Sequence, residues 1–147
     1  MQKKQLRYKI IDDVAIADIA FEIYGKDINE LFENAALAIF EQSADIRTIT
    51  GNKKQVISLN PQPLDTLLID FLSELVYLKD ASQLLGKAAK VSVTQKNKKY
   101  SLKAEIVGDT INQKKHILKS DIKAITYHMF RVEQMKNGWK AFVVVDI

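Results

Sequence analysis

Two segments with apolar residues at helical spacing constrain the fold of this chain more than any other feature. Residues 26–45, KDINELFENAALAIFEQSAD, repeat apolar residues every three or four positions behind a capping-box-like start at Asp27 and Glu30. Residues 61–82, PQPLDTLLIDFLSELVYLKDAS, show the same spacing, and Pro63 suits the first turn of a helix. Each segment therefore predicts an amphipathic helix that buries one apolar stripe against another layer.

The segments around these two helices alternate in the manner of β-strands. The expected strands are residues 6–25 as two strands or one bent strand, residues 55–60, residues 89–108 as a hairpin about KNKK, and residues 122–147 as a hairpin about Asn137-Gly138. Residues 109–121 are polar and are expected to form a loop. The sequence therefore predicts an α+β fold, a single domain over residues 1–147 with two helices packed on a mixed, largely antiparallel β-sheet.

The composition argues against several classes of protein. The chain has no cysteine, so it offers no disulfide, thiolate metal site or thiol nucleophile. Its charged N-terminus lacks the apolar run of a signal peptide, and no stretch approaches the ~20 apolar residues of a membrane helix. We therefore expect a cytoplasmic protein. The net charge of +4 permits contact with nucleic acid but does not by itself indicate it.

Motifs for nucleotide binding and nucleophilic catalysis are also missing from the sequence. The chain contains none of the patterns G-x-x-x-x-G-K-[ST], G-x-G-x-x-G and G-x-S-x-G. With two histidines and no cysteine, a tight zinc site is not expected. We therefore expect a protein that is not an enzyme by itself.

Two aspartates lie in segments that otherwise look buried. Asp18 interrupts VAIADIAF, and Asp146 ends AFVVVDI beside the α-carboxylate of Ile147. A buried carboxylate needs a compensating partner, which could be an arginine, a set of backbone N–H groups or a metal ion such as Ca²⁺ or Mg²⁺. The alternative is that Asp146 is a solvated strand end and Asp18 a capped or paired residue. Spacing alone favours this alternative.

A further candidate region is KAITYHMF, residues 123–130, which carries more polar groups than a core strand should. His128 shares a strand face with mainly apolar neighbours, where a histidine usually hydrogen-bonds a nearby group. Lys123 opens the strand on the other face, where a lysine is usually solvated. His116 lies in the polar loop beside two lysines, and its simplest interpretation is a surface position.

Six short motifs follow one another along the chain in a characteristic order. They are ADI at 17–19, YGKDINELFENAALAIFE at 24–41, LLIDFLSELVYLKD at 67–80, KKH at 114–116, KAITYH at 123–128 and DI at 146–147. Each motif is weak alone, but together they resemble the archease family over nearly the whole chain. KAITYH and the terminal DI are the most telling pair.

The resemblance implies an accessory role. Archeases assist the GTP-dependent RNA ligase that joins a 2′,3′-cyclic phosphate or 3′-phosphate end to a 5′-hydroxyl in tRNA splicing and RNA repair. They promote guanylylation of the ligase and its return to the active state. In the family, a metal usually described as calcium is held by residues that correspond to Asp18, Asp146 and Ile147 in this chain. The resemblance thus favours the metal interpretation of these residues, with Ca²⁺ expected and Mg²⁺ or another divalent cation as the alternative.

The resemblance also bears on the polar residues of the later motifs. We expect Lys123, His128 and His116 to support the metal ligands or to contact the ligase. The chain departs from the family pattern near Asp18. Ala15 stands where the family usually has histidine, Ile16 replaces threonine, and Ala20 replaces a common glycine.

Two rival functions come from other classes of protein. The first is an RNA-binding module or chaperone that uses basic loops, with Lys96, Lys98 and Lys99 as the phosphate-binding residues. The second is a metal-dependent hydrolase, which the scarcity of histidine and of clustered acids disfavours. Salt-sensitive RNA binding would indicate the first, and phosphoester turnover by the isolated protein would indicate the second.

Overall fold

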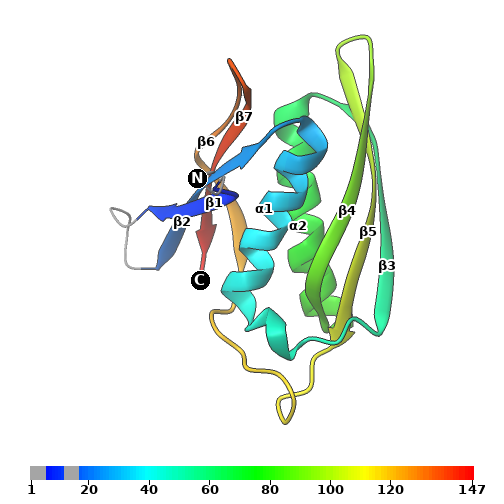
Figure 1. Ribbon diagram of the computed structural model, residues 1–147, viewed down its shortest axis with the longest axis vertical. Helices are drawn as coiled ribbons and strands as arrows, with labels where there is room; N and C mark the ends of the chain where they lie inside the picture. Colours follow the sequence, from blue (N-terminus) through cyan, green and yellow to red (C-terminus); the bar gives the residue numbers. More distant parts are fainter. Residues whose placement is uncertain (1–5, 12–16) are drawn as a thin grey trace, which may run out of the picture.

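Two helices form the middle layer of the structure, with a β-sheet on either side of them (Figure 1). The computed structural model describes residues 6–11 and 17–147. The helices are α1 (Ile28–Ser43) and α2 (Leu64–Ser82), and a short 3₁₀ turn, η1 (Ile46–Thr48), follows the first. The four-stranded sheet has the order β1 (Tyr8–Ile11), β2 (Asp18–Gly25), β7 (Gly138–Asp146), β6 (Ala124–Met135). The three-stranded sheet has the order β3 (Lys53–Gln62), β5 (Lys99–Thr110), β4 (Leu84–Lys96).

The predicted fold class is confirmed, and the structure refines it in one respect. Every pairing among the described strands is antiparallel, and the strands form two sheets where the sequence suggested one mixed sheet. The reason lies in α1, whose buried residues cover much more than one stripe of the helix. They are Leu31, Phe32, Asn34, Ala35, Ala36, Ala38, Ile39 and Phe40. A helix that is apolar over most of its circumference has to be covered on two sides.

The start of α1 follows the predicted capping pattern. The Asp27 carboxylate accepts a hydrogen bond from the Glu30 backbone N–H at 2.8 Å, and the Glu30 carboxylate accepts one from the Lys26 N–H at 3.2 Å. Gly25 precedes this cap, and a Cβ atom there would lie 2.3 Å from the Leu31 backbone nitrogen. The glycine therefore lets β2 turn directly into α1 with no space left between them.

One apolar core runs through the layers and holds both sheets on the helices. The four-stranded sheet contributes alternate residues such as Phe21, Ile23 and Val143, which are almost completely buried. The three-stranded sheet contributes Leu102 and Ile106 in the same way. Neither of the two helices is long and apolar enough to cross a membrane within the described part of the chain. The extent of the domain over residues 1–147 stays a prediction.

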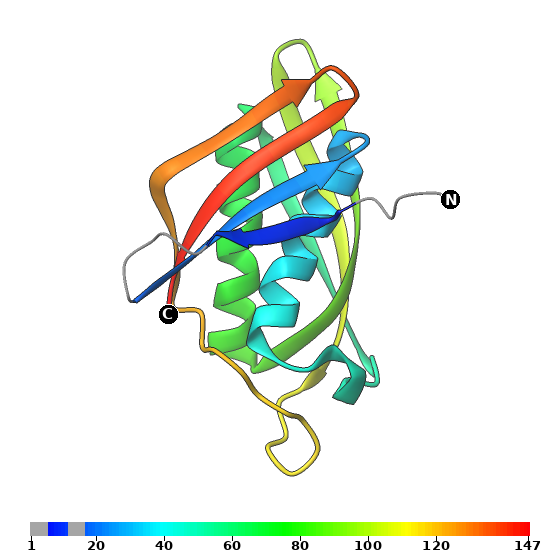
Figure 2. The same ribbon diagram turned by 60° about the vertical axis from the view of Figure 1, so that its left-hand side comes forward.

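Three strand ends meet at one corner of the four-stranded sheet. Figure 2 shows the C-terminus beside the start of β2, with the beginning of β6 on the other side of β7. β7 is an inner strand, so its last residues have a neighbour on both sides. The fold thus brings the start of β2, the start of β6 and the end of β7 together, and these ends carry the positions singled out above.

Candidate functional site

The start of β2 and the end of β7 place two carboxyl groups side by side. Asp18 is the first residue of β2 and Asp146 is the last residue of β7, and the antiparallel register pairs them directly. Side chains at paired positions point to the same face of a sheet, with Cβ atoms about 5 Å apart. Asp18 is half-buried and Asp146 is exposed, so the pair opens to solvent. Ala124, the first residue of β6, flanks Asp146 on its other side.

Backbone hydrogen bonds fix the chain on both sides of this pair. The Lys123 N–H donates to the Asp146 carbonyl at 2.8 Å, and the Ile147 N–H donates to the Ala17 carbonyl at 2.9 Å. The Ile147 side chain packs against the apolar core. These contacts hold the carboxylate of Ile147 at the same end of the sheet as the Asp18–Asp146 pair.

Asp146 perturbs the ionisation of the neighbouring Asp18. A hydrogen bond with Asp146 raises the pKa of the Asp18 carboxyl, and partial burial and the negative charge of Asp146 raise it further. The charge of His128 acts in the opposite direction and lowers the pKa of Asp18, so the histidine lies near enough to influence this pair. Two adjacent carboxyl groups repel one another when both are ionised, and a cation bound between them would remove that repulsion.

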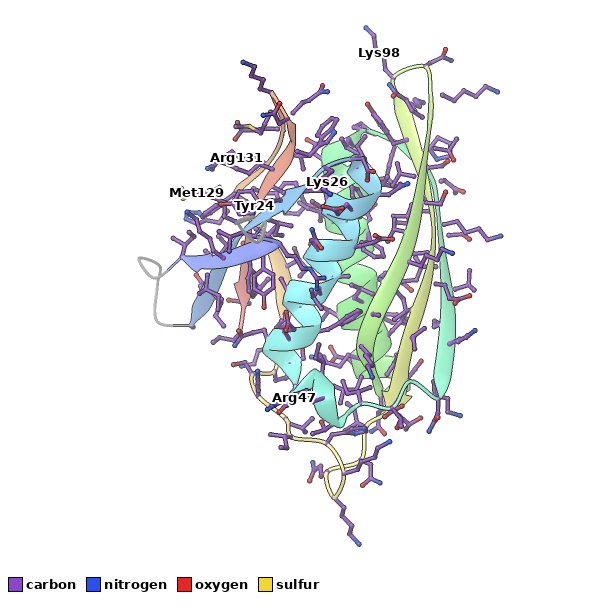
Figure 3. All side chains as sticks on the ribbon, viewed as in Figure 1. Tyr24, Lys26, Arg47, Lys98, Met129 and Arg131 are labelled. Carbon is purple, nitrogen blue, oxygen red and sulfur yellow. The ribbon has the colours of Figure 1, made fainter. Side chains whose placement is uncertain are left out.

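A bulge in β6 brings His128 to the aspartates. Between the pairs Thr126–Val144 and Arg131–Phe142, β7 has one residue and β6 has four. Met129 in this bulge has a φ of 53°, a left-handed conformation that few side chains adopt. The Thr126 hydroxyl donates to the Val144 carbonyl at 2.9 Å and accepts from the His128 N–H at 3.3 Å, which closes the bulge. Figure 3 shows Met129 and Arg131 on the side of the sheet away from the helices.

Because of the bulge, the predicted orientation of His128 was wrong. The sequence placed it in a regular strand with its ring beside apolar neighbours, whereas the extra residues expose it. KAITYHMF is therefore rich in polar residues because part of β6 bulges out of its pairing with β7 and is exposed to solvent. Lys123 is exposed beside the pair, and the contact that it makes there comes from its backbone.

The donors at this corner fit a hard divalent cation. Carboxylate oxygens are the ligands that Ca²⁺ and Mg²⁺ prefer. Within the described residues, no group of three or more His, Cys, Asp or Glu side chains comes together. A metal held by Asp18 and Asp146 would therefore take its remaining ligands from the Ile147 carboxylate and from water.

The structure places His116 elsewhere, and the expectation of a surface position was wrong. His116 is 5% exposed, and its Nε2 lies 2.9 Å from a carboxylate oxygen of Asp109, itself 4% exposed. The Asn112 N–H donates to His116 Nδ1 at 3.0 Å, so Nε2 carries the proton that is donated to Asp109. His116 thus belongs to a buried cluster in the loop after β5, and its ring does not bond either aspartate of the corner site.

The Asp109 carboxylate accepts hydrogen bonds from residues in two separate loops. It accepts hydrogen bonds from the backbone N–H groups of Thr50, Gly51 and Asn52 at 2.8–3.0 Å. The Lys115 ammonium contacts it at 3.0 Å. Burial by itself raises the pKa of Asp109, but the bonds from the backbone, His116 and Lys115 outweigh it and hold the pKa far below its usual range. This cluster fastens the loop before β3 to the end of β5.

Sequence reasoning missed Asp109 because it assigned the residue to a polar loop, whereas β5 continues to Thr110. Of the departures from the family pattern, Ala15 and Ile16 lie outside the described residues. Ala20 is fully buried and packs with Phe142 and Val144 on the outer face of the sheet, which makes the surroundings of the site apolar.

Comparison with known proteins gives a consistent result. Residues 8–147 match the Archease protein family (MTH1598/TM1083). The chain is 37% identical over 148 residues to Protein archease from Methanosarcina barkeri, covering 100% of both chains, and 38% identical over 132 residues to that of Pyrococcus furiosus, covering 89% and 93%. It resembles the solution structure of Methanobacterium thermoautotrophicum protein 1598, with a TM-score of 0.83, 30% identity and coverage of 96% and 99%. A Thermotoga maritima protein, described as an archease and possible chaperone, shares the fold with a TM-score of 0.59, 18% identity and coverage of 100% and 98%.

Proposed function

The chain belongs to the archease family, and from that membership we propose that it is a non-catalytic activator of a GTP-dependent RNA ligase. The ligase would join a 3′-phosphate or 2′,3′-cyclic phosphate end to a 5′-hydroxyl, and this protein would promote its guanylylation and repeated turnover. The observation that carries the proposal is the direct pairing of Asp18 with Asp146 at an open corner of the sheet. An accessory role also agrees with the description of the Thermotoga maritima relative as a possible chaperone.

The corner would act by presenting a metal-bearing surface to the ligase. Asp18, Asp146 and the Ile147 carboxylate would hold the metal, and β2 and β7 fix their positions through the strand ladder. His128 favours the ionised form of Asp18, which is the form able to bind a cation. When bound, the cation would supply positive charge for the phosphates of the ligase-bound nucleotide. The rigid sheet behind the corner would keep the ligands aligned while the two proteins dock.

The test is ligase guanylylation and multiple-turnover RNA joining with and without this protein. The wild-type chain should stimulate both reactions. Asp146→Ala should remove the stimulation and leave the fold unchanged, because the side chain of Asp146 is exposed and lies outside the core. Asp80→Ala is the matched control, since Asp80 is an exposed aspartate on α2 that forms an ion pair with Lys79.

The outcomes separate the function from its site. Stimulation by the wild type and by Asp80→Ala, with none by Asp146→Ala, would support both. Stimulation by all three proteins would keep the function and reject the aspartate pair as its site. Absence of stimulation by the wild-type chain would reject the function itself.

The role of Ile147 is tested separately by adding two glycines after it. If its carboxylate is a ligand, the extension moves that charge away from the aspartates and lowers calcium affinity. Calcium affinity that is equal in the extended and wild-type chains would leave the two aspartates as the only protein ligands. Isothermal titration of the isolated protein with CaCl₂ measures this directly.

A further inference from the structure

The outer face of the three-stranded sheet carries a regular series of lysines. The inner residues of its strands, such as Val91 and Leu102, lie in the core, so their neighbours along each strand face solvent. Lys54 pairs with Val107, Lys90 with Glu105 and Lys103 with Ser92, in three successive outward rows. The fourth row holds Thr94 and Ser101, and the fifth pairs Lys96 with Lys99. Every outward row therefore offers at least one ammonium or hydroxyl group.

The three-stranded sheet and its β4–β5 turn carry the net positive charge of the molecule. Residues 53–62 and 84–110 contain eight lysines and two acidic residues, a surplus of six, whereas the whole chain has a surplus of four. The remainder of the chain is therefore net negative. One of the two acids, Asp109, is buried and already saturated with donors, which leaves Glu105 as the only acid on the outer face. The Lys54 ammonium lies 3.8 Å from its carboxylate.

The same face is hollowed. A groove of about 650 Å³ lies over the three strands and is lined by residues that include Ser58, Ser92, Thr94, Ser101, Lys90 and Lys103. All of the lining lies within the described residues, and it contains no aromatic ring. The Lys98 side chain extends the basic surface beyond the hairpin at one end (Figure 3). The groove therefore offers ammonium and hydroxyl groups beside apolar side chains such as Val56, but no aromatic ring for base stacking.

We infer that this groove binds the sugar–phosphate backbone of single-stranded RNA. Five rows of an antiparallel ladder cover about 27 Å along β5, with successive rows about 7 Å apart. Cationic groups at this repeat meet successive phosphates of an extended strand. Serine and threonine hydroxyls between the lysines both donate and accept, as the ribose 2′-hydroxyl requires. Without aromatic side chains, recognition would be independent of base sequence and strongly dependent on salt.

The proposal differs from the RNA-binding alternative that the sequence raised. The basic loop KNKK forms the β4–β5 turn at one end of the sheet, whereas Lys115 lies beyond the other end and binds Asp109. The structure thus keeps the KNKK turn and the loop of Lys115 at opposite ends of the sheet. It places the turn at the end of a longer basic surface. The inference is independent of ligase activation, because binding is measured with this protein alone.

The test is the affinity of the protein for a fluorescently labelled oligouridylate of about 12 nucleotides, long enough to cover one site. The count of cations leaves out Lys54, whose ammonium lies beside the Glu105 carboxylate, and includes Lys90, Lys96, Lys99 and Lys103. These four charges predict a slope of about −3 for the logarithm of affinity against the logarithm of salt concentration. The double variant Lys90→Glu/Lys103→Glu should lose affinity at least tenfold. Glu105→Gln should do the opposite and raise affinity, because it removes the one carboxylate from the groove.

The matched control is Lys26→Glu/Lys136→Glu, which changes net charge by the same amount at exposed positions outside the three-stranded sheet. Circular dichroism confirms that each variant is folded. Equal loss of affinity in the two double variants would overturn the proposal, as would absence of oligouridylate binding at low salt. Two further results would overturn the assignment to RNA. One is oligodeoxyuridylate binding as tightly as oligouridylate. The other is polyglutamate or anionic vesicles displacing the labelled RNA as well as unlabelled oligouridylate does.

Discussion

The corner site and the Asp109 cluster each combine an aspartate with one of the two histidines, but their electrostatics are opposite. Asp109 is surrounded by donors from two loops, His116 and Lys115, and its pKa is lowered. Asp18 faces a second carboxyl group, and its pKa is raised. A carboxylate whose acceptor positions are filled stabilises the fold. A pair of adjacent carboxyl groups at an open corner can still bind a cation, which is the property expected of a functional site.

The largest effect on stability is expected from Asp109→Asn. In the asparagine side chain an NH₂ group replaces one carboxylate oxygen. This group would point at N–H groups that now donate hydrogen bonds to Asp109. Removing one partner of a buried charged cluster costs about 3 kcal/mol of unfolding free energy. Urea denaturation measures the loss, with Asp80→Asn as the control, which should change stability by less than about 0.5 kcal/mol. A midpoint for Asp109→Asn that equals that of the wild type would show that the cluster is not structural.

The pH dependence of the same variant separates charge from packing. Because the folded pKa of Asp109 lies below its unfolded value, its stabilising effect is complete above the unfolded pKa and decreases as the pH falls toward the folded pKa. The stability difference between the wild type and Asp109→Asn should therefore stay constant above about pH 5 and shrink as the pH falls from about 5 to about 2. A difference that stays constant over this range would attribute the effect to shape alone.

The two histidines provide the next comparison. His116→Ala removes a buried ring that bonds both Asp109 and Asn112, and it should cost about 2 kcal/mol. His128→Ala removes an exposed ring from a bulge and should change stability by less than about 0.5 kcal/mol. Both variants are measured by urea denaturation at neutral pH. Equal losses would mean that the bulge is a structural element as important as the Asp109 cluster.

Calcium should stabilise the wild-type protein through the corner site. At a free concentration ten times the Kd, ligand binding adds about 1.4 kcal/mol to the free energy of unfolding. In Asp18→Asn the calcium-dependent increase in unfolding free energy should disappear. Without calcium this variant should be no less stable than the wild type, because the substitution removes a carboxyl–carboxyl contact. Thermal unfolding with CaCl₂ or EDTA measures both effects. Equal calcium-dependent shifts in wild type and variant would place the cation elsewhere.

Much of the fold could be predicted because its signals are local. The periodicity of residues 26–45 and the cap at Asp27 depend on neighbours in sequence, and so does the two-residue turn before Gly138. The division into two sheets could not be predicted in this way. It depends on Ala35, Ala36 and Ala38 of α1, and alanine is common on both buried and exposed helix faces. Only the packing of the strands on both sides shows that these alanines are buried.

The corner site was predictable only in so far as its two aspartates are charged residues within apolar segments of the sequence. Asp18 and Asp146 stand out as charges in apolar segments, but their direct pairing is a matter of strand register, which sequence spacing does not determine. The β6 bulge gave no signal, because Met129 takes a left-handed conformation without the glycine that usually marks one. The role of His116 was hidden for a similar reason, since its partner Asp109 lies in a strand that the sequence assigned to a loop.

The smallest effect on the metal is expected from Lys123→Ala/His128→Ala. Lys123 contacts the site through its backbone, which the substitution keeps, and His128 affects Asp18 through its charge rather than as a ligand of the pair. The loss of calcium affinity should therefore stay below the roughly tenfold loss expected when a group that hydrogen-bonds a metal ligand is removed. Stimulation of the ligase should decrease by about tenfold if the exposed bulge contacts it, equivalent to about 1.4 kcal/mol of interaction energy. Unchanged stimulation would restrict the functional surface to the carboxylates, and a large loss of calcium affinity would make His128 part of the metal site itself.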